Sequence, residues 1–199
     1  MNYYLLTDTE NKDSIIKAED GKQYQYFFGS GWKRTVIMLD YWNDESVKYD
    51  LYEEISESRA FYLLALNIAA KAHKNQVDIG GAPYINHPLK VAENVDELDE
   101  KIVALLHDVV EDTDVTLEQL EEAGFTPEII DAIDAMTKRD NEEYDQYLDR
   151  LTKNKTAIKV KIADMTHNSD ISRIPNPTDK DLARVKKYKE KIEKLKALV

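Results

Sequence analysis

Residues 102–113 decide the fold, and they read IVALLHDVVEDT. The first five residues of this stretch are wholly apolar, which is typical of a helix buried in a core. His107 and Asp108 follow directly, and Glu111 and Asp112 come one helical turn later. Burying such groups costs several kcal/mol unless they are paired or bind a metal. The stretch therefore predicts either a cation site at the end of a buried helix or a helix that ends in an acidic loop.

Two other stretches also place polar side chains beside restricted or apolar backbone. Asp164 interrupts the apolar pattern of residues 157–163, and an aspartate there needs a buried partner such as a metal or a histidine. A bond to His167 or to a backbone group is the alternative for this aspartate. His87 lies in segment 83–88, where proline stands at both ends and restricts the backbone, as suits a ligand. Taken together, in the order His, His-Asp, Asp, the three stretches indicate one metal site.

The rest of the chain divides into a β-rich start and a helical remainder. We predict a mainly α fold, with a helical bundle over residues 56–199 and a small β-rich appendage over residues 1–55. The β-type runs, separated by turn residues, are Tyr3–Leu6, Ser14–Lys17, Gln23–Phe28 and Arg34–Leu39. The helical segments are 56–72, 88–95 with His87 as its cap, 102–109, 116–124, 126–133, 141–152, 155–169 and 179–197. Thr116 with Gln119 fits a capping box, and Gly124 fits the stop of the same helix.

The β-rich start is aromatic. It contains seven of the 12 tyrosines and both tryptophans. These side chains either fill the small core of a thin sheet or form a surface for a protein partner.

Charge and composition limit the functions that are open to the chain. It has 27 Lys and Arg against 39 Asp and Glu, a net charge of −12, which disfavours binding to nucleic acid and to anionic membranes. No apolar stretch has the length of a membrane span. Because the first residues lack a basic region and a long apolar run, we expect no signal peptide there. Cysteine is absent, which excludes disulfides and thiolate metal sites. We expect a cytoplasmic protein. A small anionic substrate can bind only where a cation or local basic groups reverse the negative field.

Four motifs resemble those of a known family, the HD superfamily of metal-dependent phosphohydrolases. They are His73-x-x-Gln76, GAPYINHP at 81–88, ALLHDVVEDT at 104–113 and KIADMTHN at 161–168. More narrowly they resemble the hydrolase domain of the Rel/Spo enzymes and the small alarmone hydrolases. Those enzymes use Mn²⁺ to remove pyrophosphate from the 3′ position of guanosine tetra- and pentaphosphate (ppGpp and its relative). The resemblance covers about residues 60–175.

The resemblance implies roles for single residues. It implies that the metal ligands are His87, His107, Asp108 and Asp164, and that Glu111 and Asp112 position or deprotonate the attacking water. The cation is then Mn²⁺ or another divalent ion such as Fe, Ni, Zn or Mg.

The resemblance also implies a small phosphorylated substrate and residues that contact it. Asn168 matches a residue near the metal and the ribose, and Thr137 matches a pocket threonine. Among the nearby basic residues, we predict that Lys161 and then Arg173 contact phosphate. The role of the His73 motif stays open.

The sequence departs from the family at positions that contact the substrate in that family. Asp78-Ile79-Gly80 stands where the family carries basic residues, Met165 replaces an arginine, and Ile171 replaces a threonine. We expect no synthetase domain after the hydrolase domain, and residues 1–55 match nothing in the hydrolase domain.

Three functions therefore remain. The first is ppGpp 3′-pyrophosphohydrolase activity, and the second is hydrolysis of another nucleotide or a phosphomonoester. The third is a non-catalytic metal-binding interaction protein.

Overall fold

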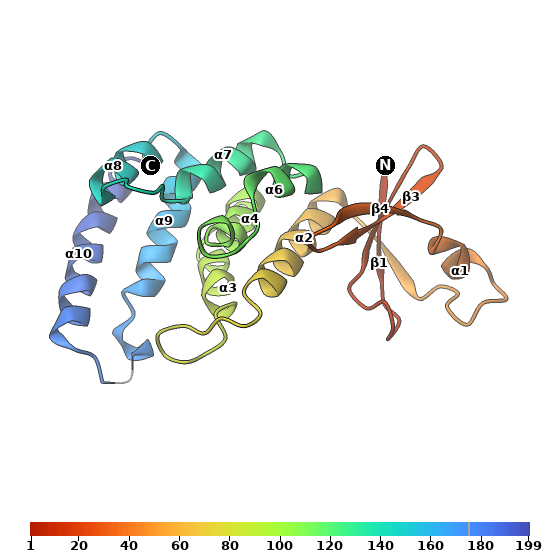
Figure 1. Ribbon diagram of the computed structural model, residues 1–199, viewed down its shortest axis with the longest axis horizontal. Helices are drawn as coiled ribbons and strands as arrows, with labels where there is room; N and C mark the ends of the chain where they lie inside the picture. Colours follow the sequence, from red (N-terminus) through yellow and green to blue (C-terminus); the bar gives the residue numbers. More distant parts are fainter. Residues whose placement is uncertain (175) are drawn as a thin grey trace.

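The computed structural model describes residues 1–174 and 176–199. The protein is elongated, with a small sheet at one end and helices along the rest of its length (Figure 1). The strands are β1 (Asn2–Leu6), β2 (Ile15–Glu19), β3 (Lys22–Phe27), β4 (Gly31–Thr35) and β5 (Tyr52–Ile55). The helices are α1 (Met38–Trp42), α2 (Glu57–Ala72), α3 (Asn86–Glu93), α4 (Leu98–Leu106), α5 (Val109–Asp112), α6 (Leu117–Ala123), α7 (Pro127–Met136), α8 (Tyr144–Leu151), α9 (Lys155–Asn168) and α10 (Asp179–Lys196), with a 3-10 turn η1 (Ile171–Arg173). The predicted fold class, mainly helical with a small N-terminal sheet, is confirmed.

The sheet is antiparallel and has the strand order β4-β3-β2-β1-β5. Successive residues of a strand point to opposite faces, and here the two faces enter two hydrophobic clusters. Tyr3 and Ile15 pack into the large core shared with the helices, whereas Tyr4 and Ile16 pack into a second cluster under α1. Buried tyrosines therefore fill the core of this thin sheet. Trp42 is exposed, and a partner surface there stays a prediction.

The predicted strand at residues 34–39 is wrong in its second half. The strand ends at Thr35, whose hydroxyl accepts a hydrogen bond from the Ile37 N–H. The Met38 N–H donates to the side-chain oxygen of Gln23. These side-chain bonds turn the backbone into α1, which buries Met38 and Tyr41 against the sheet. β5 was missed, because its sequence YEEI has two acids and buries only Ile55.

Helix α4 is the centre of the helical part. Every residue from Ile102 to Leu106 is buried, and the helix packs against α2, α3, α7 and α9. Because α4 has neighbours on all sides there, residues 102–106 are apolar all round rather than amphipathic. Its C-terminal end, at His107, therefore lies deep in the protein.

The caps predicted from sequence are mostly confirmed. Ser56 caps α2, Thr116 and Gln119 form a capping box on α6, and Gly124 ends α6 in the left-handed conformation at φ 100°. The prediction that His87 caps α3 is wrong. The cap is Ile85, and His87 lies in the first turn, where Pro88 is also accommodated.

A hydrogen bond from a tryptophan joins β4 to the end of α6. The indole N–H of Trp32 in β4 donates to the main-chain carbonyl of Ala123, the last residue of α6, at 2.8 Å. It therefore satisfies a carbonyl that the helix end would leave unpaired.

Within the described residues, no helix combines the length and the apolar character needed to cross a bilayer.

We predict that Trp32→Phe lowers the free energy of unfolding by about 1 kcal/mol, because the hydrogen bond to Ala123 is lost while an aromatic ring remains. Urea titration monitored by circular dichroism measures the change. Trp42→Phe is the matched control, since no hydrogen bond of its indole is found among the described residues. Equal stability of the two variants would contradict a stabilising role for this bond.

Candidate metal centre

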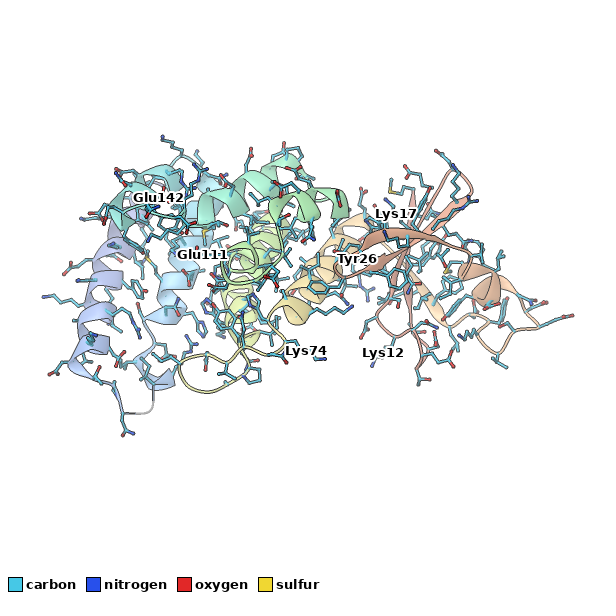
Figure 2. All side chains as sticks on the ribbon, in the orientation of Figure 1. Lys12, Lys17, Tyr26, Lys74, Glu111 and Glu142 are labelled. Carbon is cyan, nitrogen blue, oxygen red and sulfur yellow. The ribbon has the colours of Figure 1, made fainter. Side chains whose placement is uncertain are left out.

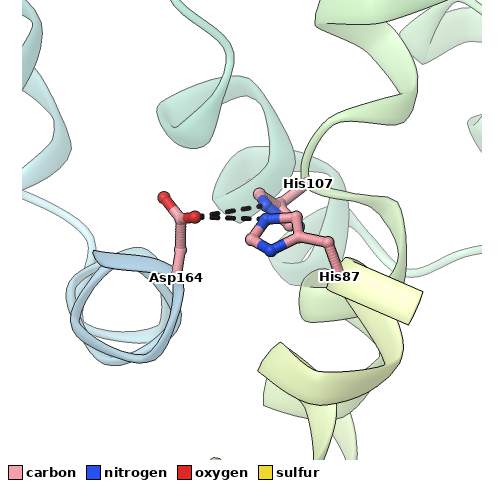
Figure 3. Close-up of side chains that lie close together, drawn as sticks. All are labelled: His87, His107 and Asp164. Carbon is pink, nitrogen blue, oxygen red and sulfur yellow. Dashed lines mark ion pairs between the residues drawn. The ribbon is translucent and has the colours of Figure 1, made fainter. Parts of the chain in front are cut away.

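The structure brings the four predicted ligands to one point. The Nε2 atom of His87 lies 3.2 Å from Oδ1 of Asp164 and 3.6 Å from Oδ2 of Asp108. The Nε2 atom of His107 lies 3.0 Å from Oδ2 of Asp108 and 3.9 Å from Oδ1 of Asp164. Figure 3 shows His87, His107 and Asp164 pointing toward one another. Residues far apart in the sequence thus form one cluster of two imidazoles and two carboxylates.

Two helices and one helix break position these side chains. His87 comes from the first turn of α3, and Asp164 from α9, both of which pack against α4. The backbone leaves α4 at His107 and enters α5 after Asp108. This break lets two consecutive side chains face the same point, which consecutive positions within one regular helix do not do.

The cluster fits a divalent cation. The Nε2 atom of His107 is fully buried and has no hydrogen-bond partner among the described residues, since its close approach to Asp108 lacks hydrogen-bond geometry. Its Nδ1 atom donates to the Ala104 carbonyl at 2.7 Å, so Nε2 is the nitrogen that presents a lone pair to the cluster. Ligand atoms of His87, His107 and Asp164 lie within 4.8 Å of one another. Imidazole and carboxylate donors suit the borderline and hard divalent ions.

The pKa values reflect the crowding of charge. Burial alone would lower the pKa of His107, but Asp108 and Asp164 outweigh it and raise that pKa to about 9. Burial opposes the ionised form of Asp108, yet the facing imidazoles lower its pKa to about 2. The pKa of Asp164 is lowered as well, against its burial, chiefly by Lys161. The carboxylates therefore demand positive charge at this point, which a bound cation supplies in place of a proton.

The Glu111–Asp112 turn lies beside the cluster, in α5. Glu111 belongs to the helical part, away from Lys12, Lys17 and Tyr26 of the N-terminal part (Figure 2). Its Oε2 atom accepts a hydrogen bond from the main-chain N–H of Lys138 at 2.8 Å.

Asp112 has an altered acidity. Burial, and then the negative charges of Asp108 and Glu111, raise its pKa. Helix α5 extends to residue 112, so Asp108, Glu111 and Asp112 lie within one helical turn of one another.

The His73 motif supports this turn. The side-chain N–H of Gln76 donates to the main-chain carbonyl of Asp112 at 2.9 Å, and Oε1 of Gln76 accepts from Nδ1 of His73 at 2.7 Å. His73 is buried, and its Nε2 atom has no partner among the described residues. The motif thus fixes the main chain that carries Asp112.

The predicted substrate contacts have different surroundings. Asn168 donates to Asp164 at 2.6 Å and also lines a cleft of 240 Å³ beside His87. Arg173 lines the same cleft. Lys161 lies 2.8 Å from Oδ2 of Asp164, below the ring of Tyr147, so its charge is directed at a predicted ligand.

Thr137 lies at the end of α7. Its hydroxyl bonds the Ile133 carbonyl, and it does not line the cleft.

Sequence reasoning missed several residues of this region. Tyr84 donates to Oδ2 of Asp108 at 2.5 Å, and Arg184 and Tyr188 of α10 line the cleft. Asp78 accepts from Arg173 at 2.8 Å. Tyr84 was within a quoted motif, but nothing in the sequence placed α10 opposite α3.

A larger cavity of 370 Å³ lies between the sheet and the helices. None of the predicted site residues lines it.

This chain is similar in sequence to two named hydrolases. A guanosine-3′,5′-bis(diphosphate) 3′-pyrophosphohydrolase of Haemophilus influenzae is 34% identical over 116 residues, which are 51% of this chain and 17% of that protein. The guanosine-3′,5′-bis(diphosphate) 3′-pyrophosphohydrolase MESH1 of Danio rerio is 46% identical over 72 residues, 32% of this chain and 40% of that one. This chain therefore spans well under half the length of these relatives.

One solved structure is also similar to this chain. It is described as a metazoan ortholog of SpoT that hydrolyses ppGpp, and it matches with a TM-score of 0.57 and 25% identity, over 72% of this chain and 86% of that chain. The sequence model of the family described as "HD domain" matches residues 65–195. That stretch contains every predicted metal ligand and well over half of the chain, so this protein belongs to the HD domain family.

Proposed function

We propose that the protein is a metal-dependent phosphohydrolase that removes pyrophosphate from the 3′ position of guanosine tetra- and pentaphosphate. The observation that carries this proposal is the meeting of two imidazoles and two carboxylates beside the Glu111–Asp112 turn. Similarity to proteins named as 3′-pyrophosphohydrolases supports the choice of substrate.

We propose that His87, His107, Asp108 and Asp164 hold the cation, and that it is Mn²⁺, with Fe, Ni, Zn or Mg as alternatives. The ion supplies Lewis acidity, which activates water and offsets charge on phosphoryl oxygens. Tyr84 and Lys161 each bond one carboxylate of the set, which limits the directions in which Asp108 and Asp164 can turn.

The reaction needs two proton movements. It breaks the bond between the 3′ oxygen and its phosphorus, the oxygen of water joins that phosphorus, and pyrophosphate leaves the nucleoside. One proton must leave the water and one must reach the 3′ oxygen. In this proposal Glu111, whose carboxylate is held by the Lys138 N–H, accepts the first proton. Asp112, with its raised pKa, is suited to hold the second.

The cleft beside the cluster supplies the substrate contacts in this proposal. Arg173 and Arg184 bring two guanidinium groups to it, which is what a polyphosphate requires on a chain whose net charge is −12. Asn168 lies between this cleft and Asp164, and the ring of Tyr188 offers a face to a base. Lys161 stays a predicted phosphate contact, although its charge is already directed at Asp164.

A second candidate is hydrolysis of another nucleotide or of a phosphomonoester. The observation that favours it is Asp78, whose carboxylate pairs with Arg173 in the cleft and offsets the charge of that guanidinium group. A substrate with fewer phosphates would need less positive charge than ppGpp does.

A substrate panel separates the candidates. We expect protein loaded with Mn²⁺ to release pyrophosphate from guanosine tetraphosphate and no phosphate from ordinary nucleotides or a chromogenic phosphate ester. Chromatography of the products measures this outcome. Phosphate release from the other compounds would establish the second candidate instead, and no turnover of any compound by metal-loaded protein would leave a non-catalytic metal-binding protein.

We predict that His107→Ala weakens Mn²⁺ binding by more than about 100-fold, because loss of a supporting residue alone costs about 10- to 100-fold. The same variant loses activity. Competition with a fluorescent chelator measures the metal affinity. Unchanged affinity in this variant would remove His107 from the set of ligands.

We predict that Glu111→Gln keeps Mn²⁺ affinity and lowers kcat by roughly 100- to 10,000-fold, as expected for loss of a proton acceptor. Glu121→Gln on the exposed side of α6 is the matched control, with unchanged kcat. Loss of metal from the Glu111 variant would make Glu111 a ligand, and an unchanged kcat would exclude it from proton transfer.

A further inference from the structure

We infer that His167 is a positioning residue for the metal site. It holds the imidazole of His87 in the tautomer that a metal ligand needs, and Arg173 fixes His167 in that role. The inference rests on the proposed metal site and is independent of the proposed substrate.

The two imidazoles are joined by a hydrogen bond. The Nδ1 atoms of His87 and His167 lie 2.7 Å apart, the ring planes differ by 15°, and the ring centroids are 4.9 Å apart. Two rings stacked face to face cannot bring two of their atoms this close without a clash. The rings therefore meet edge to edge in nearly one plane, which is the geometry of an N–H···N hydrogen bond.

Arg173 determines which histidine donates. Its Nη1 atom lies 3.3 Å from the same Nδ1 atom of His167. A guanidinium group has donors and no acceptor, so this nitrogen of His167 carries no proton and accepts. The Nδ1 atom of His87 must then be the donor. This leaves Nε2 of His87 to present its lone pair toward Asp164 and Asp108, at 3.2 and 3.6 Å.

The two histidine ligands are thus oriented in the same way, by a hydrogen bond from Nδ1. For His107 the acceptor is the main-chain carbonyl of Ala104, at 2.7 Å. For His87 the acceptor is a side chain, so its support depends on the identity of residue 167.

Arg173 is itself held from two sides. Its Nη2 atom donates to Asp78 at 2.8 Å, and its Nη1 atom also lies 3.2 Å from the main-chain carbonyl of His167. Asp78 is fixed in turn by the N–H groups of Gly80 and Ala82, each 2.9 Å from its Oδ1 atom. A continuous series of hydrogen bonds therefore leads from Asp78 through Arg173 and His167 to His87. It gives a structural reason for an acid at position 78.

The tautomers of the unaltered protein provide the first test. Long-range ¹H–¹⁵N correlation spectra of the full chain at neutral pH report which ring nitrogen of each histidine carries a proton. The spectrum of His167→Asn assigns the His167 signals by their absence. We expect His167 as the tautomer protonated at Nε2. A His167 protonated at Nδ1 would overturn the inference.

Metal affinity provides the second test. His167→Phe keeps a flat ring but removes the acceptor, and we expect it to weaken Mn²⁺ binding by about 10- to 100-fold. His167→Asn offers a carbonyl oxygen as acceptor, and we expect it to stay within about threefold of the unaltered protein. Thr166→Ala, next to it on the exposed side of α9, is the control for general effects on the helix. Thermal unfolding establishes that each variant is folded.

The outcomes separate this inference from the function on which it rests. If the unaltered protein binds Mn²⁺ and His167→Phe binds it equally well, the inference is wrong while the metal site stands. If the unaltered protein binds no divalent metal, both the metal site and the inference are wrong. Equal weakening by the Phe and Asn variants would assign His167 to packing rather than to hydrogen bonding.

Discussion

The structure depends on a concentration of charge at one buried point. Asp164 and the two imidazoles of His87 and His107 are almost fully buried, and Asp108 lies against them. Carboxylates in such surroundings are strongly unfavourable unless positive charge lies between them. The pKa of His107 is raised and that of Asp164 is lowered because opposite charges lie beside each of them. One divalent cation would supply that charge, and the break between α4 and α5 lets His107 and Asp108 face the same point.

The surroundings of the cluster are arranged to keep it in one conformation. Each carboxylate and each imidazole has a partner outside the cluster: Tyr84 on Asp108, Lys161 and Asn168 on Asp164, Ala104 on His107, and His167 on His87. Catalysis of hydrolysis gains from ligands that need not reorganise as charge develops. The helical core supplies this rigidity, because α3 and α9 pack on the same central helix, α4.

The sequence predicted the helical fold and the meeting of the site residues, because buried helices leave a strong apolar pattern and the interruptions of that pattern are few. Residue 107 follows five apolar residues, and such a position can hardly be on the surface. Residues 34–39 show the limit of local sequence patterns. β-Forming residues there leave the strand and lead into α1, because the side chains of Thr35 and Gln23 accept hydrogen bonds from the main chain. The pairing of Asp78 with Arg173 was also beyond the sequence. The two residues are far apart in the chain, and only tertiary structure brings them together.

The most direct test of this account is a crystal structure of the protein grown with Mn²⁺, with data collected at the manganese absorption edge. The account predicts one anomalous peak at coordination distance from His87, His107, Asp108 and Asp164, with the Glu111 carboxylate outside that distance. A peak elsewhere on the protein, or an ion held without the two histidines, would contradict it.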